Sequence, residues 1–306
     1  MPSTKLALVG TAFAIAITCA SPLARAEGPP LAKKPPPYSL AWQLRPAAAG
    51  NVVRSDTTVA MFKGADQDGV TVASTLLASY KLTPELALLG RLAIVRNAPP
   101  MGESASSVSN PLLGVIWAPP LLAAPWKLAF FGAVTVPVGS GGGDSADAAM
   151  KAANASAMAA RSSMDNALFA VNDSAAIAGA DLAYVKNGLT LQLEATFFEL
   201  FRVRGGPDAT KTNFTSGFHA GYFVMPWLSI GGELRYQRYL STPAFVKADT
   251  TGANRDNASA ALGLRAHIPL GDGQWLRPGI AYARGLDDPM SKNGYHVVQV
   301  DVPFAF

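Results

Sequence analysis

The sequence has few charged residues, one cysteine and no long hydrophobic run. Of its 306 residues, 15% are charged, against roughly 25% in an average soluble protein. By contrast, 49% are hydrophobic, and the mean hydropathy is +0.20. The longest apolar stretch of the body, Leu112 to Trp126, is interrupted by one glycine and three prolines, so a transmembrane helix of about 18 or more apolar residues is excluded. A membrane-like composition without helical spans favours a β-barrel, the other fold that satisfies every backbone group within lipid.

The cysteine, Cys19, lies in a stretch typical of a secretory signal peptide, residues 1–26. Lys5 supplies the positive start, Leu6 to Ala20 the short apolar core, and Ala24-Arg25-Ala26 the cleavage motif. Cleavage would leave no cysteine, and hence no disulfide or thiolate chemistry. It would also lower the formal net charge from +4 to +2 by removing one lysine and one arginine. Such a small excess of positive charge is no argument for nucleic-acid binding.

The next segment, residues 27–49, is expected to be a periplasmic, proline-rich N-terminal segment without a fold of its own. Residues 50–306 are expected to form an all-β, transmembrane antiparallel barrel of about 12 strands, because hydrophobic residues there recur at every second position. The predicted strands are 50–63, 69–82, 86–97, 105–118, 126–138, 174–186, 189–203, 212–225, 228–241, 256–269, 275–286 and 294–306. Residues 38–46 are either a thirteenth strand or, more in keeping with an even strand number, part of the lead-in to the first strand.

The last strand ends in alternating apolar residues that include Phe304 and the terminal Phe306. This ending resembles the C-terminal assembly signal of bacterial outer-membrane proteins. With a periplasmic C-terminus, the two longest connections, 139–173 and 242–255, both fall on the outer side, as in known barrels. Aromatic residues support the same orientation, because many lie beside the predicted inner turns and three toward the outer ends. Those toward the outer ends are Tyr236, Tyr239 and Tyr295.

Alternation also assigns the charged side chains to the lumen, since a basic residue facing lipid would cost about 2–4 kcal/mol. These residues are expected to form either a polar constriction that filters solutes or a salt-bridged core that only holds the barrel together. The predicted lumen-lining residues are Arg91, Asp181, Glu194, Glu233, Arg235, Arg265, His267, Arg277 and Asp301.

The long outer connection has a glycine-rich hinge followed by an alanine- and methionine-rich stretch, Ala146 to Met164, which is predicted to be a short helix. Asp144 or Ser145 is its expected N-cap. This helix could fold into the mouth as a constriction or plug, or it could pack on the rim or at the lipid surface. The residues assigned to a gating role are Met150, Met158, Arg161 and Met164.

Catalysis and metal binding find little support in the sequence. The three histidines, His219, His267 and His296, lie on separate predicted strands and show no metal-binding spacing. His296 shares the parity of the lipid-facing residues, so an outer-membrane lipid hydrolase is a remote alternative. No His-x-Ser-Asn-Gly element accompanies it. We expect no catalytic residue, no metal and no cofactor.

Two motifs connect the chain to a known family. Asn110-Pro111-Leu112-Leu113-Gly114 lies in one predicted strand, and Val134-Thr135-Val136-Pro137-Val138-Gly139 ends the next, before the long outer segment and the aromatic C-terminus. Over roughly residues 105–306 the chain resembles the outer-membrane barrels grouped with the meta-pathway phenol-degradation transporters. The resemblance implies a porin-like barrel for small, often aromatic, carbon compounds.

Together these patterns predict an outer-membrane channel for passive or facilitated passage of small, weakly polar or aromatic solutes. Its expected partners are outer-membrane lipid and lipopolysaccharide, the barrel-assembly machinery and the small-molecule solute. The alternative is a closed barrel with a structural or surface-interaction role and no transport.

Overall fold

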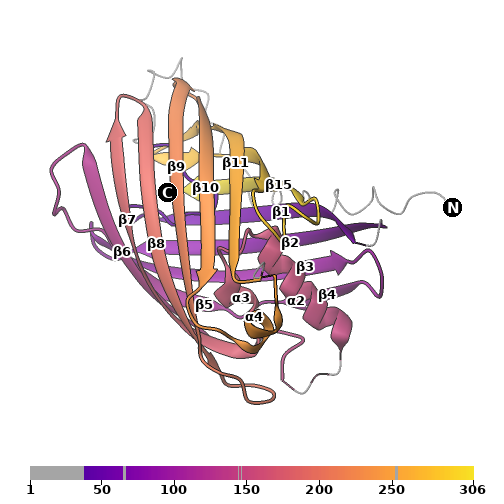
Figure 1. Ribbon diagram of the computed structural model, residues 1–306. Coiled ribbons are helices and arrows are strands. Elements are labelled where there is room, and N and C mark those ends of the chain that lie inside the picture. The colour runs from indigo at the N-terminus through magenta and orange to yellow at the C-terminus, as the bar shows by residue number, and fades with distance from the viewer. Residues whose placement is uncertain (1–37, 65–66, 144, 146, 252–253) are drawn as a thin grey trace. The chain divides into compact units, whose positions relative to one another are not determined.

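A computed structural model describes residues 38–306 except 65–66, 144, 146 and 252–253, so the predicted signal peptide lies outside the described residues. The chain forms one antiparallel sheet that closes on itself where β1 pairs with β15 (Figure 1). Its strands are β1 (Val52–Gly64), β2 (Gln67–Lys81), β3 (Leu86–Ala98), β4 (Ala105–Val108), β5 (Leu112–Trp117), β6 (Trp126–Thr135), β7 (Asp173–Lys186), β8 (Leu189–Arg202), β9 (Lys211–Met225), β10 (Leu228–Tyr239), β11 (Asp256–Ala266), β12 (Ile268–Gly271), β13 (Gln274–Leu276), β14 (Gly279–Gly285) and β15 (His296–Ala305).

These segments make a barrel of 12 strands, because three of the strands are each interrupted once. Both β4 and β5 pair with β3, on either side of the break at Asn110-Pro111. Likewise, β12 continues β11, and β13 leads into β14. The prediction of twelve strands is confirmed, and the bounds differ by a few residues. For example, β6 ends at Thr135 instead of 138, just before Val136-Pro137, where proline has no N–H for a ladder.

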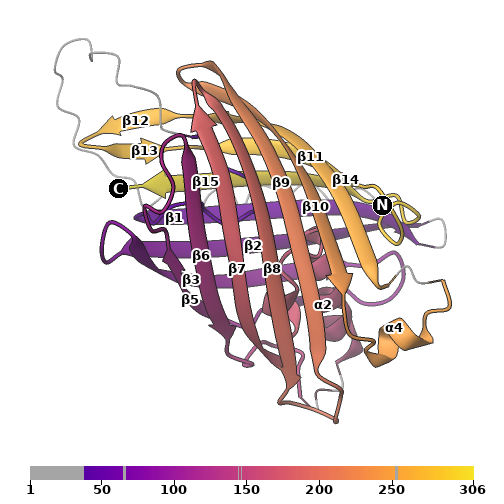
Figure 2. The same cartoon turned by 60° about the vertical axis from the view of Figure 1, so that its left-hand side comes forward.

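The two faces of the wall differ in the way that alternation predicts. Along β8 the polar side chains of Gln192 and Glu194 are buried inside, whereas Leu193 between them is 51% exposed on the outer face. The same alternation runs along β15, where Gln299 and Asp301 are buried. Figure 2 shows the long strands β6 to β10 side by side. The outer surface is therefore apolar, and the polar groups line the lumen.

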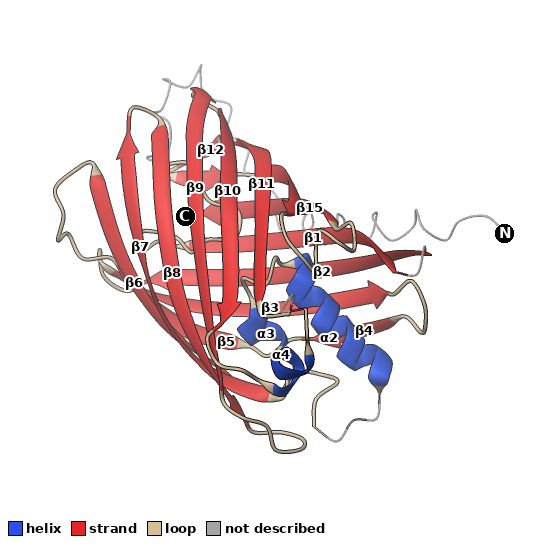
Figure 3. Ribbon diagram, viewed as in Figure 1, coloured by secondary structure: helices blue, strands red, loops and turns tan. Residues whose placement is uncertain are grey.

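The connections are short at one end of the barrel and long at the other. At the end with short connections, here called the turn end, two residues each join β7 to β8 and β9 to β10. The other end, here called the loop end, carries α2 (Ala148–Ala160) and α3 (Asn166–Phe169) between β6 and β7. It also carries α4 (Ala244–Ala248) between β10 and β11 (Figure 3). Among the described residues no helix is long and apolar enough to cross a membrane.

The predicted helix is present but shorter than expected. Asp147 is its N-cap in place of Ser145, with its side chain accepting from the Met150 N–H at 2.8 Å, and the other predicted cap, Asp144, lies outside the described residues. The helix ends before Ser162 and Ser163, whose φ angles of 51° and 56° are left-handed. Such angles stop an α-helix, so the chain turns there and continues into α3.

The aromatic prediction holds at the turn end and fails in part at the loop end. Trp117, Trp126 and Trp227 are exposed on the outer face near the turns. Tyr239 and Tyr295, which were predicted among the aromatic residues toward the outer ends of the strands, are buried instead of facing outward. Tyr295, which directly precedes β15, stacks on Phe62 of β1 with a centroid separation of 4.8 Å.

Candidate functional site

The candidate site is the lumen, and two parts of the chain fill it. One is the segment 38–47, here called the N-terminal insert, which enters from the turn end. The other is the connection 139–172, here called the loop insert, which carries α2 and α3 and enters from the loop end. Figure 1 shows α2 against β1 to β4, whereas α3 contacts α2 and β7. Both inserts contact the predicted lumen residues.

The structure decides between the two alternatives for residues 38–46. These residues contain no helix or strand, so they are not a thirteenth strand. They precede β1, as the second alternative states, but they lie inside the barrel. Trp42 is 1% exposed, and its backbone N–H donates to the Glu233 carboxylate at 2.7 Å. Arg45 contacts Glu194 through its backbone N–H and its guanidinium, both at 2.5 Å. The described part of the predicted periplasmic segment therefore includes residues that lie inside the barrel.

The loop insert is anchored to the opposite part of the wall by buried ion pairs. Arg161 contacts Asp56 of β1 and Asp165 of its own loop, each at 2.9 Å. Arg91 of β3 forms two hydrogen bonds with Asp165, at 2.7 and 3.0 Å. Burial alone would raise the pKa of Asp165, but the guanidinium groups of Arg91 and Arg161 outweigh it and hold that pKa below the ordinary range. This cluster of Asp56, Arg91, Arg161 and Asp165 is here called the loop latch.

Polar side chains connect the two inserts through the wall. Arg235 donates to Glu233 at 2.7 Å and also to the Ser162 hydroxyl of the loop insert at 3.3 Å. Gln299 donates to the Trp42 carbonyl at 3.2 Å and to Asp56, a member of the loop latch, at 3.0 Å. A narrow cavity of about 20 Å³ separates the inserts, with Trp42 and Arg161 among its lining residues. That volume is close to what one water molecule needs.

All nine predicted lumen residues face inward in the structure. Arg265 and Asp301 form a bidentate pair at 2.7 and 3.0 Å, and Arg54 also contacts Asp301. His267 contacts the Ser229 hydroxyl at 2.8 Å. Eight of the nine residues have relative exposures of 0 to 9%. Arg91 is half-buried as a whole residue, but its side chain alone is only 8% exposed. The members of this group are Arg91, Asp181, Glu194, Glu233, Arg235, Arg265, His267, Arg277 and Asp301.

The charges divide by side of the barrel. Carboxylates dominate in the middle of β7, β8 and β10, through Asp181, Glu194 and Glu233, while Arg235 on β10 and Arg202 at the end of β8 are cations. Arginines dominate on the other half, from β11 through β15 and β1 to β3, where the buried carboxylates among the described strand residues are Asp56 and Asp301. A field therefore crosses the lumen from one half to the other. The backbone of Trp42 is aligned with this field, because its N–H points toward Glu233 and its carbonyl toward Arg54 and Gln299.

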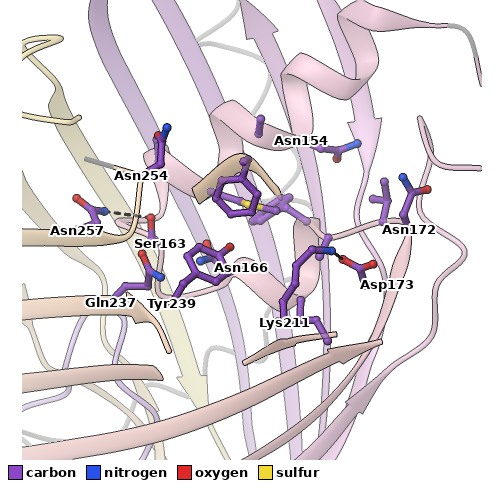
Figure 4. A pocket seen from close by; sticks show the side chains of 18 of the residues that line it. Asn154, Ser163, Asn166, Asn172, Asp173, Lys211, Gln237, Tyr239, Asn254 and Asn257 are labelled. Carbon is purple, nitrogen blue, oxygen red and sulfur yellow. Dashed lines mark hydrogen bonds and ion pairs between the residues drawn. The ribbon is translucent and has the colours of Figure 1, made fainter. Parts of the chain in front are cut away.

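A larger cavity of about 520 Å³ lies at the loop end, between the loop insert and the wall of β8 to β11 (Figure 4). Its polar lining is rich in carboxamides, including Asn154, Asn166 and Asn257. Lys211 and Asp173 point toward one another there, and they pair at 2.8 Å. The apolar lining includes Met158, Phe169, Phe245 and Met290. A cavity of this size, with apolar walls and a few polar groups, suits a small ligand.

The four predicted gating residues occupy different places in the loop insert. Met158 lines the loop-end cavity and is half-buried, while Met164 and Arg161 are fully buried. Met150 is half-buried against Gly141.

The sequence did not reveal which residue holds the ends of the loop. Asn110, which is fully buried, accepts from Gly139 N–H at 2.9 Å and donates to the carbonyls of Ala170 and Asp173 at 2.9 and 3.1 Å.

The residues with a possible catalytic role are dispersed. His219 is buried on the lumen side of β9. His296 lies near the loop end with its Nδ1 at 2.5 Å from the Tyr282 hydroxyl. Among the described residues, no cluster of three or more His, Cys, Asp and Glu side chains is placed to hold a metal ion.

Solved structures share this architecture. The chain is similar to the COG4313 outer membrane channel from Pseudomonas putida F1, with a TM-score of 0.55 and 12% identity, over 87% of this chain and 98% of that one. The chain has the fold of an outer-membrane β-barrel. At such identity the likeness concerns the fold alone. Two porins give lower scores: NanC porin, at 0.48 with 8% identity over 82% and 98% of the two chains, and KdgM porin in complex with disordered oligogalacturonate, at 0.47 with 11% identity over 83% and 99%.

No family profile and no curated protein matches the sequence. The resemblance to the phenol-degradation transporters is therefore not confirmed by comparison.

Proposed function

We propose that the protein is an outer-membrane channel for the passive or facilitated passage of small solutes. The observation that carries this proposal is the cavity of about 520 Å³ at the loop end, which lies between the barrel wall and the loop insert. The loop insert is held by ion pairs and also by apolar contacts, since Ala157, Leu168 and Phe169 belong to a hydrophobic cluster shared with the wall. Water can replace the polar contacts when an insert moves.

The lining of the loop-end cavity favours neutral solutes. Its formal charges balance, with three cationic and three anionic side chains. Four of them form a closed set, since Arg202 and Lys211 each contact both Asp173 and Asp208 at 2.6–2.9 Å. Of the other two, Asp256 pairs with Arg238 at 3.0 Å and Lys151 is exposed. The remaining lining groups that can bind a solute are carboxamides, hydroxyls and apolar side chains. Small, weakly polar or aromatic molecules match this chemistry, because carboxamides donate and accept hydrogen bonds while Phe245 and the methionines offer adaptable apolar contact.

The motifs behind the phenol-transporter resemblance support the same reading. Asn110 of the first motif and Gly139 of the second are hydrogen-bonded to one another at 2.9 Å, at the root of the loop insert. A motif that fixes this loop is expected in barrels that share a loop-controlled entrance. We therefore propose membership of that transporter group and an uptake role for carbon compounds.

The proposed location is the outer membrane, reached by export with the signal peptide 1–26 and insertion by the barrel-assembly machinery. Phe304 and Phe306 stack at 5.7 Å between ring centroids beside the C-terminus, where the assembly signal is proposed. Outer-membrane lipid and lipopolysaccharide would contact the apolar outer face.

Proteoliposome swelling with neutral solutes of increasing size tests the channel. The wild-type protein should admit phenol-sized neutral molecules faster than charged molecules of equal size. Met158→Trp should lower their uptake at least fivefold, because Met158 lines the loop-end cavity. Leu193→Trp is the matched control, since Leu193 lies on the outer face. Equal, background-level uptake for the wild-type protein and empty liposomes would contradict the proposal.

A closed structural barrel is the second candidate, and the full burial of the lumen charges favours it. Under that alternative the ion pairs serve stability alone. Arg235→Ala would then lower the free energy of unfolding without changing permeability. Under the channel proposal the same substitution also raises permeability, because Arg235 holds both Glu233 and Ser162.

A further inference from the structure

We propose that the lumen wall contains a peptide-binding track whose ligand is the N-terminal insert, so that residues 38–47 act as a tethered, displaceable plug. The proposal rests on the proposed channel function for its consequence, closure of the pore, but not for the binding itself. The ligand class is an extended peptide that contains the order tryptophan, any residue, leucine, arginine, as in Trp42 to Arg45.

The wall recognises the backbone of the insert at successive positions. Glu233 accepts from the N–H groups of Trp42 and Gln43 at 2.7 and 3.1 Å, and Glu194 accepts from the N–H of Arg45 at 2.5 Å. Carboxylates are the strongest acceptors a protein offers to backbone N–H groups. These contacts do not depend on the side chains of the insert, so they fix its path and direction.

The carbonyl groups of the insert have donors of their own. Gln192 donates to the Arg45 carbonyl at 2.6 Å, and Gln299 donates to the Trp42 carbonyl at 3.2 Å. Nearly all of these partners are side chains of the wall, not strand backbones. The insert is therefore bound as a ligand is bound in a groove, and not as a further strand of the sheet.

Glycines in the wall make sockets for the side chains of the insert. A Cβ added at Gly217 would lie 2.5 Å from Leu44, and one at Gly279 would lie 2.7 Å from the Trp42 ring. Glycine within a strand often marks the close approach of another chain segment. The Arg265 guanidinium covers the Trp42 ring at 4.3 Å from its centroid, a cation–π contact. Trp42 and Leu44 are thus the anchors of the ligand.

The fit of the insert leaves polar groups without partners. Among the described residues, neither amide atom of the buried Gln43 side chain has a hydrogen-bond partner, and the Trp42 indole N–H has none. These groups gain water when the insert leaves the lumen, as do Glu194 and Glu233. Withdrawal therefore exchanges one set of polar contacts for another, and its main cost is the exposure of the two buried anchors, Trp42 and Leu44. The anchors hold the plug at rest, while its polar contacts can be replaced by water.

A disulfide lock tests whether the insert must move for solutes to pass. The hydroxyl oxygens of Ser39 and Ser229 lie 3.4 Å apart, so Ser39→Cys with Ser229→Cys places two sulfur atoms within reach of a bond. In planar bilayers the oxidised double variant should conduct at least tenfold less than after reduction. Each single variant is a control and should not respond to oxidation. Equal conductance of the oxidised and reduced double variant would overturn the plug.

Peptide binding tests the track without any need for transport. A barrel lacking residues 38–47 should bind a fluorescent peptide of sequence YSLAWQLRPA, measured by anisotropy, at least tenfold more tightly than the same peptide with alanine in place of tryptophan and leucine. Gly217→Val in that barrel should weaken binding at least tenfold, whereas Gly232→Val, where a Cβ meets nothing closer than 3.6 Å, should not. Equal binding of both peptides, or no binding, would overturn the track. Failure of conductance in every variant, with peptide binding intact, would refute the channel and leave the track standing.

A full-length variant covers the case in which the shortened barrel does not fold. Gly217→Val in the complete chain should expel Leu44 and expose residues 38–47 to protease, while the wild-type protein and Gly232→Val protect them. Equal protection in all three proteins would overturn the proposal.

Discussion

Removal of the Arg161 side chain should release the loop insert from the wall. Arg161 is fully buried and contacts the carboxylates of Asp56 and Asp165, each at 2.9 Å. In Arg161→Ala, Asp165 keeps Arg91, but Asp56 loses its closest cationic partner, since Arg54 lies 3.8 Å away from it. Removing one partner of a buried ion pair costs about 3–5 kcal/mol. The population of the undocked loop should therefore rise about 150- to 5,000-fold.

Two measurements report this release. Amide hydrogen exchange of α2 and α3 should accelerate by a similar factor, up to the limit set by free exchange, while the wall strands β7 to β9 keep their protection. In planar bilayers the open probability should rise in parallel. Arg161→Lys should give an intermediate result, because an ammonium keeps the charge but loses the planar fork that reaches both carboxylates.

Lys151→Ala is the matched control, because the Lys151 side chain is exposed on the same helix. It should leave both measurements unchanged. Wild-type exchange of α2 and α3 in Arg161→Ala would refute the reasoning that the loop latch docks the insert. Faster exchange with unchanged open probability would refute the link between docking and closure.

The remaining predictions concern the root of the loop, pH and assembly. Asn110→Ala should lower the stability of the docked loop by about 1–3 kcal/mol, because it leaves a buried carbonyl or N–H unpaired. Amide hydrogen exchange at residues 166–172 should then be faster, and unchanged exchange there would contradict the prediction. Because the pKa of Asp165 is depressed, its contribution to docking is fully present above the ordinary aspartate value of about 3.9 and is lost only as pH falls below that value. Loop protection, corrected for intrinsic exchange rates, should thus be constant from pH 7 to about pH 4.5, and a loss near pH 6 would contradict the latch. Phe306→Ala should reduce the amount of heat-modifiable, folded barrel in outer-membrane fractions several-fold, with Phe306→Tyr near wild type; equal amounts would contradict the assembly role.

The sequence was most informative about the wall. A barrel strand exposes one face to lipid and one to the lumen, so its period of two is visible in residues such as those around Leu193, and turn residues mark the ends. The same parity placed every predicted charge inward, including Asp301 and Arg265. The sequence did not predict that the strands are interrupted at Asn110-Pro111 and Arg277-Pro278. A proline within a strand indicates a break in the hydrogen-bond ladder, but it does not show where the ladder resumes.

The contents of the lumen could not be predicted in the same way. The N-terminal insert has no period, since its contacts are made by backbone groups to Glu194 and Glu233 from distant strands. Proline-rich surroundings suggested an extended linker. The glycines that receive it, Gly217 and Gly279, look in sequence like ordinary small residues of a strand. A signal was present in Trp42, the one tryptophan away from the predicted turns, which is unusual for a linker.

The ion pairs of the loop insert were equally hidden. Arg161 was assigned to a gating role because it shares a helical stripe with apolar residues, but its partner Asp56 lies about a hundred positions earlier in the chain. Pairing between residues so far apart depends on the closed barrel, which brings β1 and the loop together. Asn110 was seen as part of a motif, and its function as a clamp became visible only with the loop in place.

Single-channel recording in planar bilayers tests the central claim most directly, namely that the lumen is a solute path closed by two displaceable inserts. The wild-type protein should show rare, low-conductance openings. Arg161→Ala and Gly217→Val should each raise the open probability, and the two together should raise it further and increase the conductance. Silence of the wild-type protein and of all three variants, with correctly folded barrels, would contradict the claim.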